Sequence, residues 1–309
     1  MELRDLRYFL ACVDEGNMTQ AGRRVHAAQP TLSHAIRRLE DQAGTRLLER
    51  RPRHRVRPTP AGELLAARAR RSLEAIRGFA DDLAALQGLL TGTLRVAAMQ
   101  SLAVTLLPST LTLFARRYPA VQIEARVAPA NEIVGEVRDG RTDVGLIAGP
   151  TPALPHVVKA EGLYREPFVA VVRAADPFAR RAHLRLLDLK DTPMVLVPPS
   201  SPTGAIIHAA FAAAGFAPRI RLTFDSGEAL RELVRAGVGV TILPARYLQG
   251  PQRGLRAVRL VRPTPWRDVQ ALTSTGETSA AAAAFLELVR QHAAVDPEGR
   301  RPRPPVGAD

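Results

Sequence analysis

The chain has 309 residues, 46% of them apolar and 24% charged, which suits two or three domains with a sizeable core and argues against global disorder. Its formal net charge is +13, and residues 1–58 alone hold 12 Arg against 7 Asp and Glu. Such a balance indicates a polyanionic partner, although an excess of arginine can also reflect a GC-rich genome.

The single cysteine, Cys12, excludes an internal disulfide and a cysteine-based metal cluster. We interpret it as a core residue, because it falls on the apolar side of a predicted helix. The first residues are charged, and no apolar segment typical of a signal peptide follows them. The longest uncharged run, 96–115, contains Pro108 and several hydroxyl side chains, which disfavours a membrane span. We therefore expect a soluble, cytoplasmic protein without a membrane partner.

Residues 3 to about 43 contain three short helical patterns. The second starts at Asn17, a good N-cap residue. The third begins near Gln29 and Pro30, and a proline in the first turn costs no hydrogen bond. Its expected buried face consists of Leu32, Ile36 and Leu39.

Two short helices followed by a third with an exposed polar face are typical of a helix-turn-helix that enters the DNA major groove. Its N-terminal residues should reach deepest, so we assign Gln29, Ser33 and His34 to base edges. Arg37 and Arg38 are assigned mostly to phosphates. The alternative for each is a solvated helix face. The predicted DNA contacts, including the loop described next, are Gln29, Pro30, Thr31, Ser33, His34, Arg37, Arg38, Arg50, Arg53 and Arg55.

A basic loop, residues 50–58, follows these helices and favours the DNA interpretation. Arginine hairpins beside a recognition helix enter the minor groove, where the potential is most negative. Arg53 and Arg55 are expected at the tip of this loop.

Thr59 and Pro60 predict the start of a long helix that reaches about Gln87. Its apolar residues recur at steps of four and three, which is the spacing of a coiled-coil seam. A helix of this length extends roughly 40 Å, too far to be buried against one small domain. We expect a homodimer through this helix; the alternative is an amphipathic helix lying on its own protein. The seam residues are Ala69, Leu73, Ile76, Ala80 and Leu83.

From Gly92 onward, short apolar runs alternate with helical patterns, which predicts an α/β region with largely parallel sheets. About 200 residues of this kind should form two lobes rather than one sheet. The expected strands are 94–97, 121–127, 144–147, 168–172, 194–197, 220–224, 240–243, 255–261 and 269–272, and the main helices are 106–118, 133–137, 205–214, 227–236 and 280–292.

The predicted organisation has four parts: a DNA-binding domain (1–58), a linker helix (59–90), a two-lobed effector domain (91–292) and a disordered tail (293–309). Lobe I is expected at about 91–161 and 267–292, and lobe II at about 162–266.

Ligands of α/β sheets bind at the carboxyl ends of the strands, so a cleft between the lobes is the expected effector site. Hydroxyl and amide side chains at predicted strand ends and helix starts suit a carboxylate or similar anion. The alternative is that they only cap helices. The predicted effector-binding residues are Gln100, Ser101, Asn131, Ser200, Ser201, Thr203 and Phe224.

No catalytic, metal-binding or cofactor-binding motif appears. The leading hypothesis is ligand-responsive transcription control. The second is an architectural DNA-binding protein without a true effector. The third, an α/β enzyme fused to a DNA-binding module, would require turnover of a cleft ligand.

The first 62 residues contain the segments 3–9, 17–22, 29–33, 36–40, Gly44, 47–50 and 59–62, and through these segments they closely resemble the LysR-type transcriptional regulators. The resemblance implies a winged helix-turn-helix, a dimerising linker helix and a two-lobed effector domain similar to type 2 periplasmic binding proteins. It further implies a homotetramer on interrupted promoter dyads, with RNA polymerase as a further partner.

Three positions depart from the family pattern. Ala28 stands where a capping serine is frequent, and the loss of such a cap typically costs ~1 kcal/mol. His34 replaces a frequent arginine, and the wing at 51–58 is one residue longer. We therefore expect a target sequence different from that of typical relatives.

Overall fold

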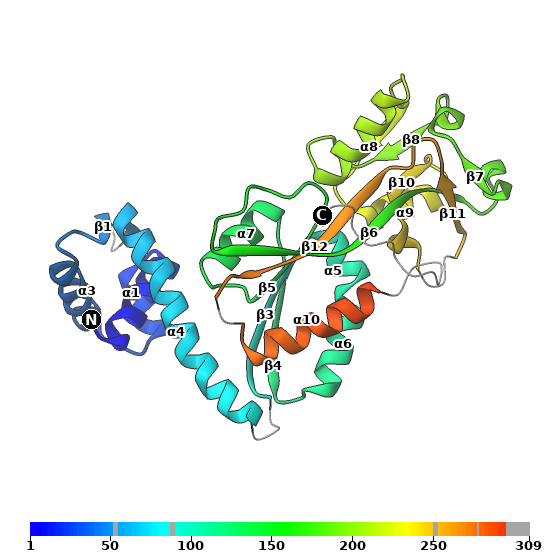
Figure 1. Ribbon diagram of the computed structural model, residues 1–309. Helices are drawn as coiled ribbons and strands as arrows, with labels where there is room; N and C mark the ends of the chain where they lie inside the picture. Colours follow the sequence, from blue (N-terminus) through cyan, green and yellow to red (C-terminus); the bar gives the residue numbers. More distant parts are fainter. Residues whose placement is uncertain (52–54, 87–89, 250–252, 277, 295–309) are drawn as a thin grey trace.

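The computed structural model describes residues 1–309 apart from 52–54, 87–89, 250–252, 277 and 295–309. An N-terminal domain and a two-lobed α/β domain are joined by one long helix (Figure 1). This helix contacts the first helix and the second strand of the N-terminal domain and the last helix of the α/β domain. The predicted tail lies outside the described residues from residue 295 onward, and its first residue, Ala293, still belongs to the last helix.

The N-terminal domain is a three-helix unit followed by a β-hairpin. Asn17 caps the second helix as predicted, because its side chain accepts hydrogen bonds from the backbone of Thr19 and Gln20. Ala28 precedes the third helix without any side-chain cap. The elements are α1 (Leu3–Glu15), α2 (Met18–Arg24), α3 (Gln29–Ala43), β1 (Leu48–Arg51) and β2 (Arg55–Pro58).

The linker helix α4 (Pro60–Leu86) lies close to its predicted bounds. Ala69 and Leu73 pack into the core of the N-terminal domain, so the first half of the seam is covered by the same chain. Ile76, one turn later, is 46% exposed. The side chains of Ala80 and Leu83 lie outside the described residues. The first half of this helix therefore lies on its own protein, and further along it meets α10 (Ala280–Ala293) of lobe I. The homodimer through this helix stays a prediction.

Lobe I is built on parallel strands with helices around them. β3 is paired in parallel with both β4 and β5. Its core includes Phe114 and Phe285, whose rings meet edge to face at 5.7 Å. The elements are β3 (Gly92–Ala98), α5 (Gln100–Thr105), α6 (Leu107–Arg117), β4 (Val121–Val127), α7 (Ala130–Arg138), β5 (Val144–Ala148) and α10 (Ala280–Ala293).

Lobe II has its own apolar core around Phe168, Phe211 and Ile242. Its elements are η1 (Pro177–Arg180), β7 (His183–Leu184), η2 (Leu186–Leu189), β8 (Met194–Leu196), α8 (Pro202–Ala213), β9 (Ile220–Thr223), α9 (Gly227–Arg235), β10 (Thr241–Pro244), η3 (Ala245–Leu248) and β11 (Leu255–Leu260).

Two long strands, β6 (Val158–Arg173) and β12 (Trp266–Ser274), connect the lobes. They run antiparallel, and β6 continues into lobe II, where it pairs with β10 and β11. The prediction of largely parallel sheets is therefore wrong: β6 forms only antiparallel pairs, and the sheets are mixed. The first half of β6 was also not predicted.

Candidate DNA-binding and effector sites

The third helix presents its polar face outward, as the apolar pattern predicted. Leu32, Ile36 and Leu39 are at most 2% exposed and lock α3 into the core of the N-terminal domain. Among the predicted DNA contacts on this helix, Ser33 is half-buried, and the exposed residues are Gln29, Pro30, Thr31, His34, Arg37 and Arg38.

Arg38 has a structural partner that the sequence did not indicate. Its Nε and Nη2 donate to the two carboxylate oxygens of Asp5 at 3.1 and 2.5 Å. Asp5 is buried, whereas the Arg38 side chain remains half exposed. The hydrogen bond to Asp5 raises the pKa of the Arg38 guanidinium. This bidentate pair fixes α3 to α1, so Arg38 has a structural role in holding α3 in place, independent of any contact with DNA.

The basic loop forms a two-stranded wing beside the helices. An antiparallel bridge joins Arg55 to Asn17, and the backbone N–H of Val56 donates to Gly16 at 2.9 Å. Arg55 is exposed. Arg53 and the side chain of Arg50 lie outside the described residues. The wing is therefore anchored at the start of α2.

The predicted effector residues lie at the starts of helices in both lobes. Gln100 begins α5, and Ser101, the second residue of this helix, is 9% exposed. A Cβ placed on Gly149, at the end of β5, would lie 3.5 Å from the Cβ of Pro202. The start of α8 in lobe II therefore lies against lobe I.

The remaining effector residues are placed less favourably. The Ser201 hydroxyl accepts from the Gly204 backbone at 3.0 Å and donates to the Pro198 carbonyl at 2.9 Å, so its donor and one of its two acceptor lone pairs are already engaged at the start of α8. Ser200 is exposed and Thr203 is half-buried beside it. Asn131 and Phe224 are exposed, and within the described part of the chain no hydrogen bond joins them to the other predicted residues.

A buried charged cluster lies where the paired strands β6 and β12 connect the lobes. It was not predicted from the sequence. Arg267 donates to Oε2 of Glu166 through Nε at 2.8 Å, and both side chains are 1% exposed. Nη1 of Arg267 donates to the Ser101 hydroxyl at 2.8 Å. This cluster therefore links a predicted effector residue of lobe I to the inter-lobe crossing.

The same cluster reaches lobe II and the last helix. The second oxygen of Glu166 accepts from the backbone N–H of Arg246, at the start of η3, at 2.8 Å. The Arg246 guanidinium lies over the Tyr164 ring at 4.2 Å and donates to the Ala293 carbonyl at 2.9 Å. Burial raises the pKa of the Tyr164 hydroxyl, which stays neutral. One buried carboxylate thus connects β6, β12, η3 and, through Ser101, α5.

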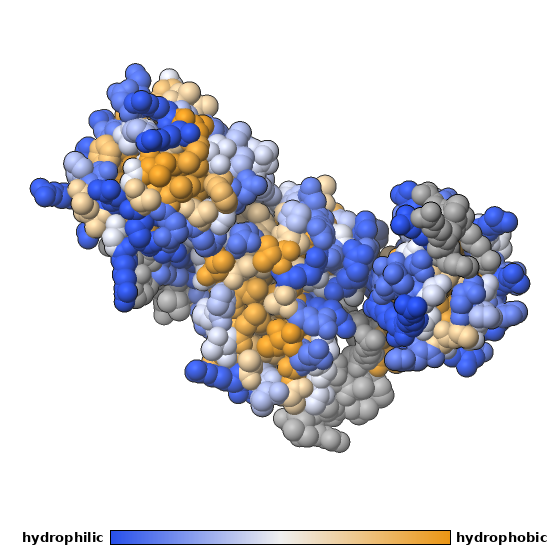
Figure 2. Space-filling view, turned by 180° about the vertical axis from the view of Figure 1, so that it is seen from behind, coloured by the Kyte–Doolittle hydropathy of each residue, from blue (hydrophilic) through white to orange (hydrophobic). Residues whose placement is uncertain are grey.

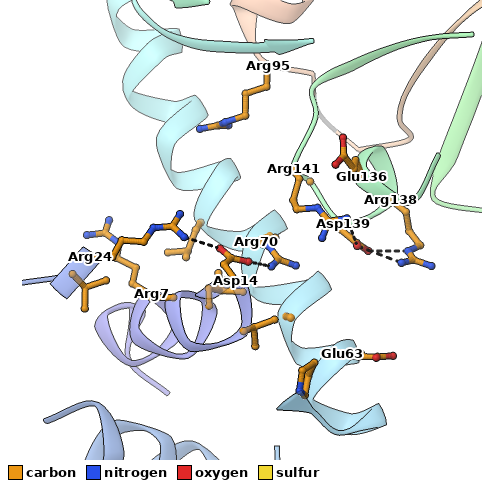
Figure 3. Close-up of a pocket in the computed structure, with 18 of the residues that line it drawn as sticks. Arg7, Asp14, Arg24, Glu63, Arg70, Arg95, Glu136, Arg138, Asp139 and Arg141 are labelled. Atoms are coloured by element: carbon orange, nitrogen blue, oxygen red, sulfur yellow. Dashed lines mark hydrogen bonds and ion pairs between the residues drawn. The ribbon is translucent and has the colours of Figure 1, made fainter. Parts of the chain in front are cut away.

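A cavity of about 1070 Å³ lies between the N-terminal domain, α4 and lobe I, away from the predicted cleft. Asp14 is paired with Arg70 of α4 and, at 3.5 Å, with Arg24 (Figure 3). On the opposite wall Asp139 pairs with Arg138 of lobe I. Charges of both signs line this space, so it is an ion-paired contact zone between domains rather than a pocket for one kind of ion.

In the described part of the chain, no group of three or more His, Cys, Asp or Glu side chains is placed to hold a metal ion. Within the same residues, no helix combines the length and apolar character that spanning a bilayer requires.

A three-helix domain with an outward polar helix, a wing, a long linker helix and a two-lobed α/β domain is the architecture of a DNA-binding regulator with an effector-binding domain. Comparison with known families agrees: residues 3–63 match the bacterial regulatory helix-turn-helix protein, lysR family, and residues 87–294 match the LysR substrate binding domain. The chain belongs to the LysR family of DNA-binding transcription regulators, whose members carry an effector-binding domain and are not known as enzymes.

Relatives and solved structures cover nearly the whole chain. A probable hydrogen peroxide-inducible genes activator from Streptomyces viridosporus is 32% identical to this chain, over 93% of this chain and 94% of the length of that relative. A full-length OxyR variant from Pseudomonas aeruginosa has a TM-score of 0.77 and 25% identity, covering 98% of both chains. Full-length CbnR complexed with its target DNA has a TM-score of 0.57 and 27% identity, covering 95% of this chain and all of the other.

The lone cysteine has a clear physical state. Cys12 is 0% exposed, its thiol donates to the sulfur of Met18 at 3.5 Å, and burial raises its pKa to about 12. We predict that native protein at about pH 8 does not react with a thiol reagent, because the thiol is neutral and inaccessible. A thiol count in native buffer and in urea tests this; one rapidly reacting thiol in the native protein would contradict it.

Proposed function

We propose that the protein is a sequence-specific promoter-binding regulator whose DNA binding is modulated by a small molecule held between the lobes. The observation that carries this proposal is the exposed polar face of α3, fixed in place by its buried residues Leu32, Ile36 and Leu39. The wing beside it supplies arginines for the flanking minor groove.

In the proposed complex Gln29, Ser33 and His34 contact base edges, and Pro30 and Thr31 line the same end of the helix. Arg37 contacts phosphate, and Arg38 does so while it remains paired with Asp5. The wing contributes Arg50, Arg53 and Arg55. A glutamine amide matches the donor and acceptor of adenine in the major groove, so Gln29 is the strongest candidate for reading a base.

Replacing Gln29 tests this assignment. A duplex selected by the wild-type protein from a random pool serves as the operator. We expect Gln29→Ala to lose about 1–3 kcal/mol of discrimination at one base-pair position, because a bidentate base contact is worth that much. Fluorescence anisotropy against the selected duplex and its single-position variants measures the loss.

Gln42→Ala is the matched control, because Gln42 is an exposed glutamine near the other end of the same helix. It should leave every affinity unchanged. Equal affinities for the selected and a random duplex at physiological salt would refute sequence-specific regulation altogether.

We further propose that the effector is a small carboxylate or similar anion. The residues proposed to bind it are Gln100, Ser101, Asn131, Ser200, Ser201, Thr203 and Phe224. The start of α8 facing lobe I, together with Ser101 at the crossing, supports this location. A thermal-shift screen of small carboxylates and aromatic acids tests it. A complete lack of shifts, with specific DNA binding intact, would favour an architectural protein without an effector.

For assembly we propose a homodimer through α4 and a homotetramer through the effector domains. Support comes from the exposed Ile76 on α4 and from exposed apolar side chains of lobe I, Val104, Leu113 and Val127. Figure 2 shows hydrophobic surface on this middle part of the molecule.

The proposed domain limits remain 1–58, 59–90, 91–292 and 293–309. The proposed location is the cytoplasm. RNA polymerase is the proposed further partner.

A further inference from the structure

The net positive charge of this chain comes from two regions. Residues 1–58 hold 12 basic against 7 acidic residues, and lobe II (162–266) holds 15 Arg and Lys against 7 Asp and Glu. The rest of the chain, 59–161 and 267–309, holds 16 of each sign. A genome-wide preference for arginine acts on all segments alike, so it does not explain a charge-balanced lobe I beside a strongly basic lobe II.

Five of the 15 Arg and Lys residues of lobe II lie on or beside β7 and β11, at one edge of its sheet. Arg259 of β11 lies directly opposite His183 of β7, and Arg256 lies three residues earlier on the same strand. η1, which carries Arg180, packs against β11. We call this surface the basic edge; its residues are Arg180, Arg181, His183, Arg185, Arg256 and Arg259, all of them exposed.

The cations of the basic edge are poorly neutralised by the protein itself. Asp188 is shared by Arg181 at 3.7 Å and Arg185 at 3.5 Å. Among the residues that the structure describes, Arg180, Arg256 and Arg259 form no ion pair. Arginines held on strands without carboxylate partners are suited to bind a polyanion, since the guanidinium matches phosphate geometry.

We propose that the basic edge binds the phosphate backbone of promoter DNA outside the site read by α3, an inference that rests on the proposed function. The charge excess occurs in the domain that carries the recognition helix and again in lobe II, and DNA presents the densest regular array of negative charge. The basic edge lies at the end of the molecule opposite α1–α3 (Figure 1). The contacted phosphates therefore belong to flanking or bent DNA, and the contact carries no base specificity.

The test uses the operator selected by the full-length wild-type protein, embedded in a short duplex and in one with long flanks on both sides. The variant Arg256→Gln/Arg259→Gln removes two cations from the basic edge. We expect it to reduce the slope of log affinity against log salt by up to about 1.8 on the long duplex, at about 0.9 per phosphate contact. On the short duplex the slope should equal that of the wild type.

The control Arg219→Gln/Arg221→Gln removes the same charge from the opposite edge of lobe II, at β9. It should leave both slopes unchanged, which separates a local contact from a change in net charge. If Arg256→Gln/Arg259→Gln has the same salt dependence of affinity as the wild type on both duplexes, the proposal is overturned. An acidic protein would then be the better candidate partner of this surface. Equal losses on both duplexes, or in both variants, would also overturn it. Failure of the wild type to select any duplex would instead count against the proposed function.

Discussion

Arg267→Met is expected to lower the free energy of unfolding of the effector domain by about 3–5 kcal/mol, because it leaves the buried Glu166 carboxylate without its counter-ion. The pair is 1% exposed on both sides, so water does not compensate the lost charge. The substitution also removes the donor to Ser101. Adding Glu166→Gln to Arg267→Met should recover part of the loss, because the amide still accepts from the Arg246 backbone while the uncompensated charge is gone.

The neighbouring pair on the same two strands provides the control. Arg165 and Asp268 lie opposite each other one residue along, 3.6 Å apart, and both are about half exposed. Arg165→Gln should therefore cost less than about 1 kcal/mol. Urea denaturation, followed by the fluorescence of Trp266, the single tryptophan, measures all variants. Similar midpoints for Arg165→Gln and Arg267→Met would show that the buried cluster does not hold the lobes together.

The secondary structure was largely accessible from the sequence, because apolar spacing survives wherever an element packs on one face. α3 illustrates this: the spacing of Leu32, Ile36 and Leu39 indicates both the helix and its exposed side. Strand direction was not accessible. The apolar run 168–172 looks the same whether its neighbours are parallel or antiparallel, and the extension of β6 back to Val158 carries mostly exposed residues that give no apolar signal.

The sites were accessible to different degrees for a similar reason. A polar face on a short helix is a local pattern, so the face of α3 could be predicted. Arg38 was assigned to phosphate, but its bond to Asp5 joins residues far apart in the sequence. Glu166 and Arg267 are farther apart still, and each alone resembles an ordinary surface charge on a strand. Only the antiparallel crossing of β6 and β12 places them side by side and buries both.

Gly62→Ala is expected to destabilise the N-terminal domain by about 1–3 kcal/mol and to weaken DNA binding with it. A Cβ at this position would overlap the carbonyl oxygen of Leu47 and lie 3.2 Å from the Cβ of Pro58. Both neighbours belong to the base of the wing. Thr59 reinforces the contact, because its hydroxyl donates to the Arg46 carbonyl at 2.8 Å and accepts from the Gly62 backbone at 3.1 Å. The first turn of α4 is thus held against the wing by a backbone approach that only glycine allows.

Gly135→Ala makes the same change inside α7, where an added Cβ meets nothing within 4 Å. It should stabilise the protein by about 0.5–1 kcal/mol, because alanine is the better helix former. Thermal unfolding of the two variants and anisotropy with the selected duplex give the comparison. If the contact between α4 and the wing positions the wing on DNA, Gly62→Ala loses affinity and Gly135→Ala keeps it. Equal stability and equal affinity of the two variants would show that the wing does not depend on the start of the linker helix.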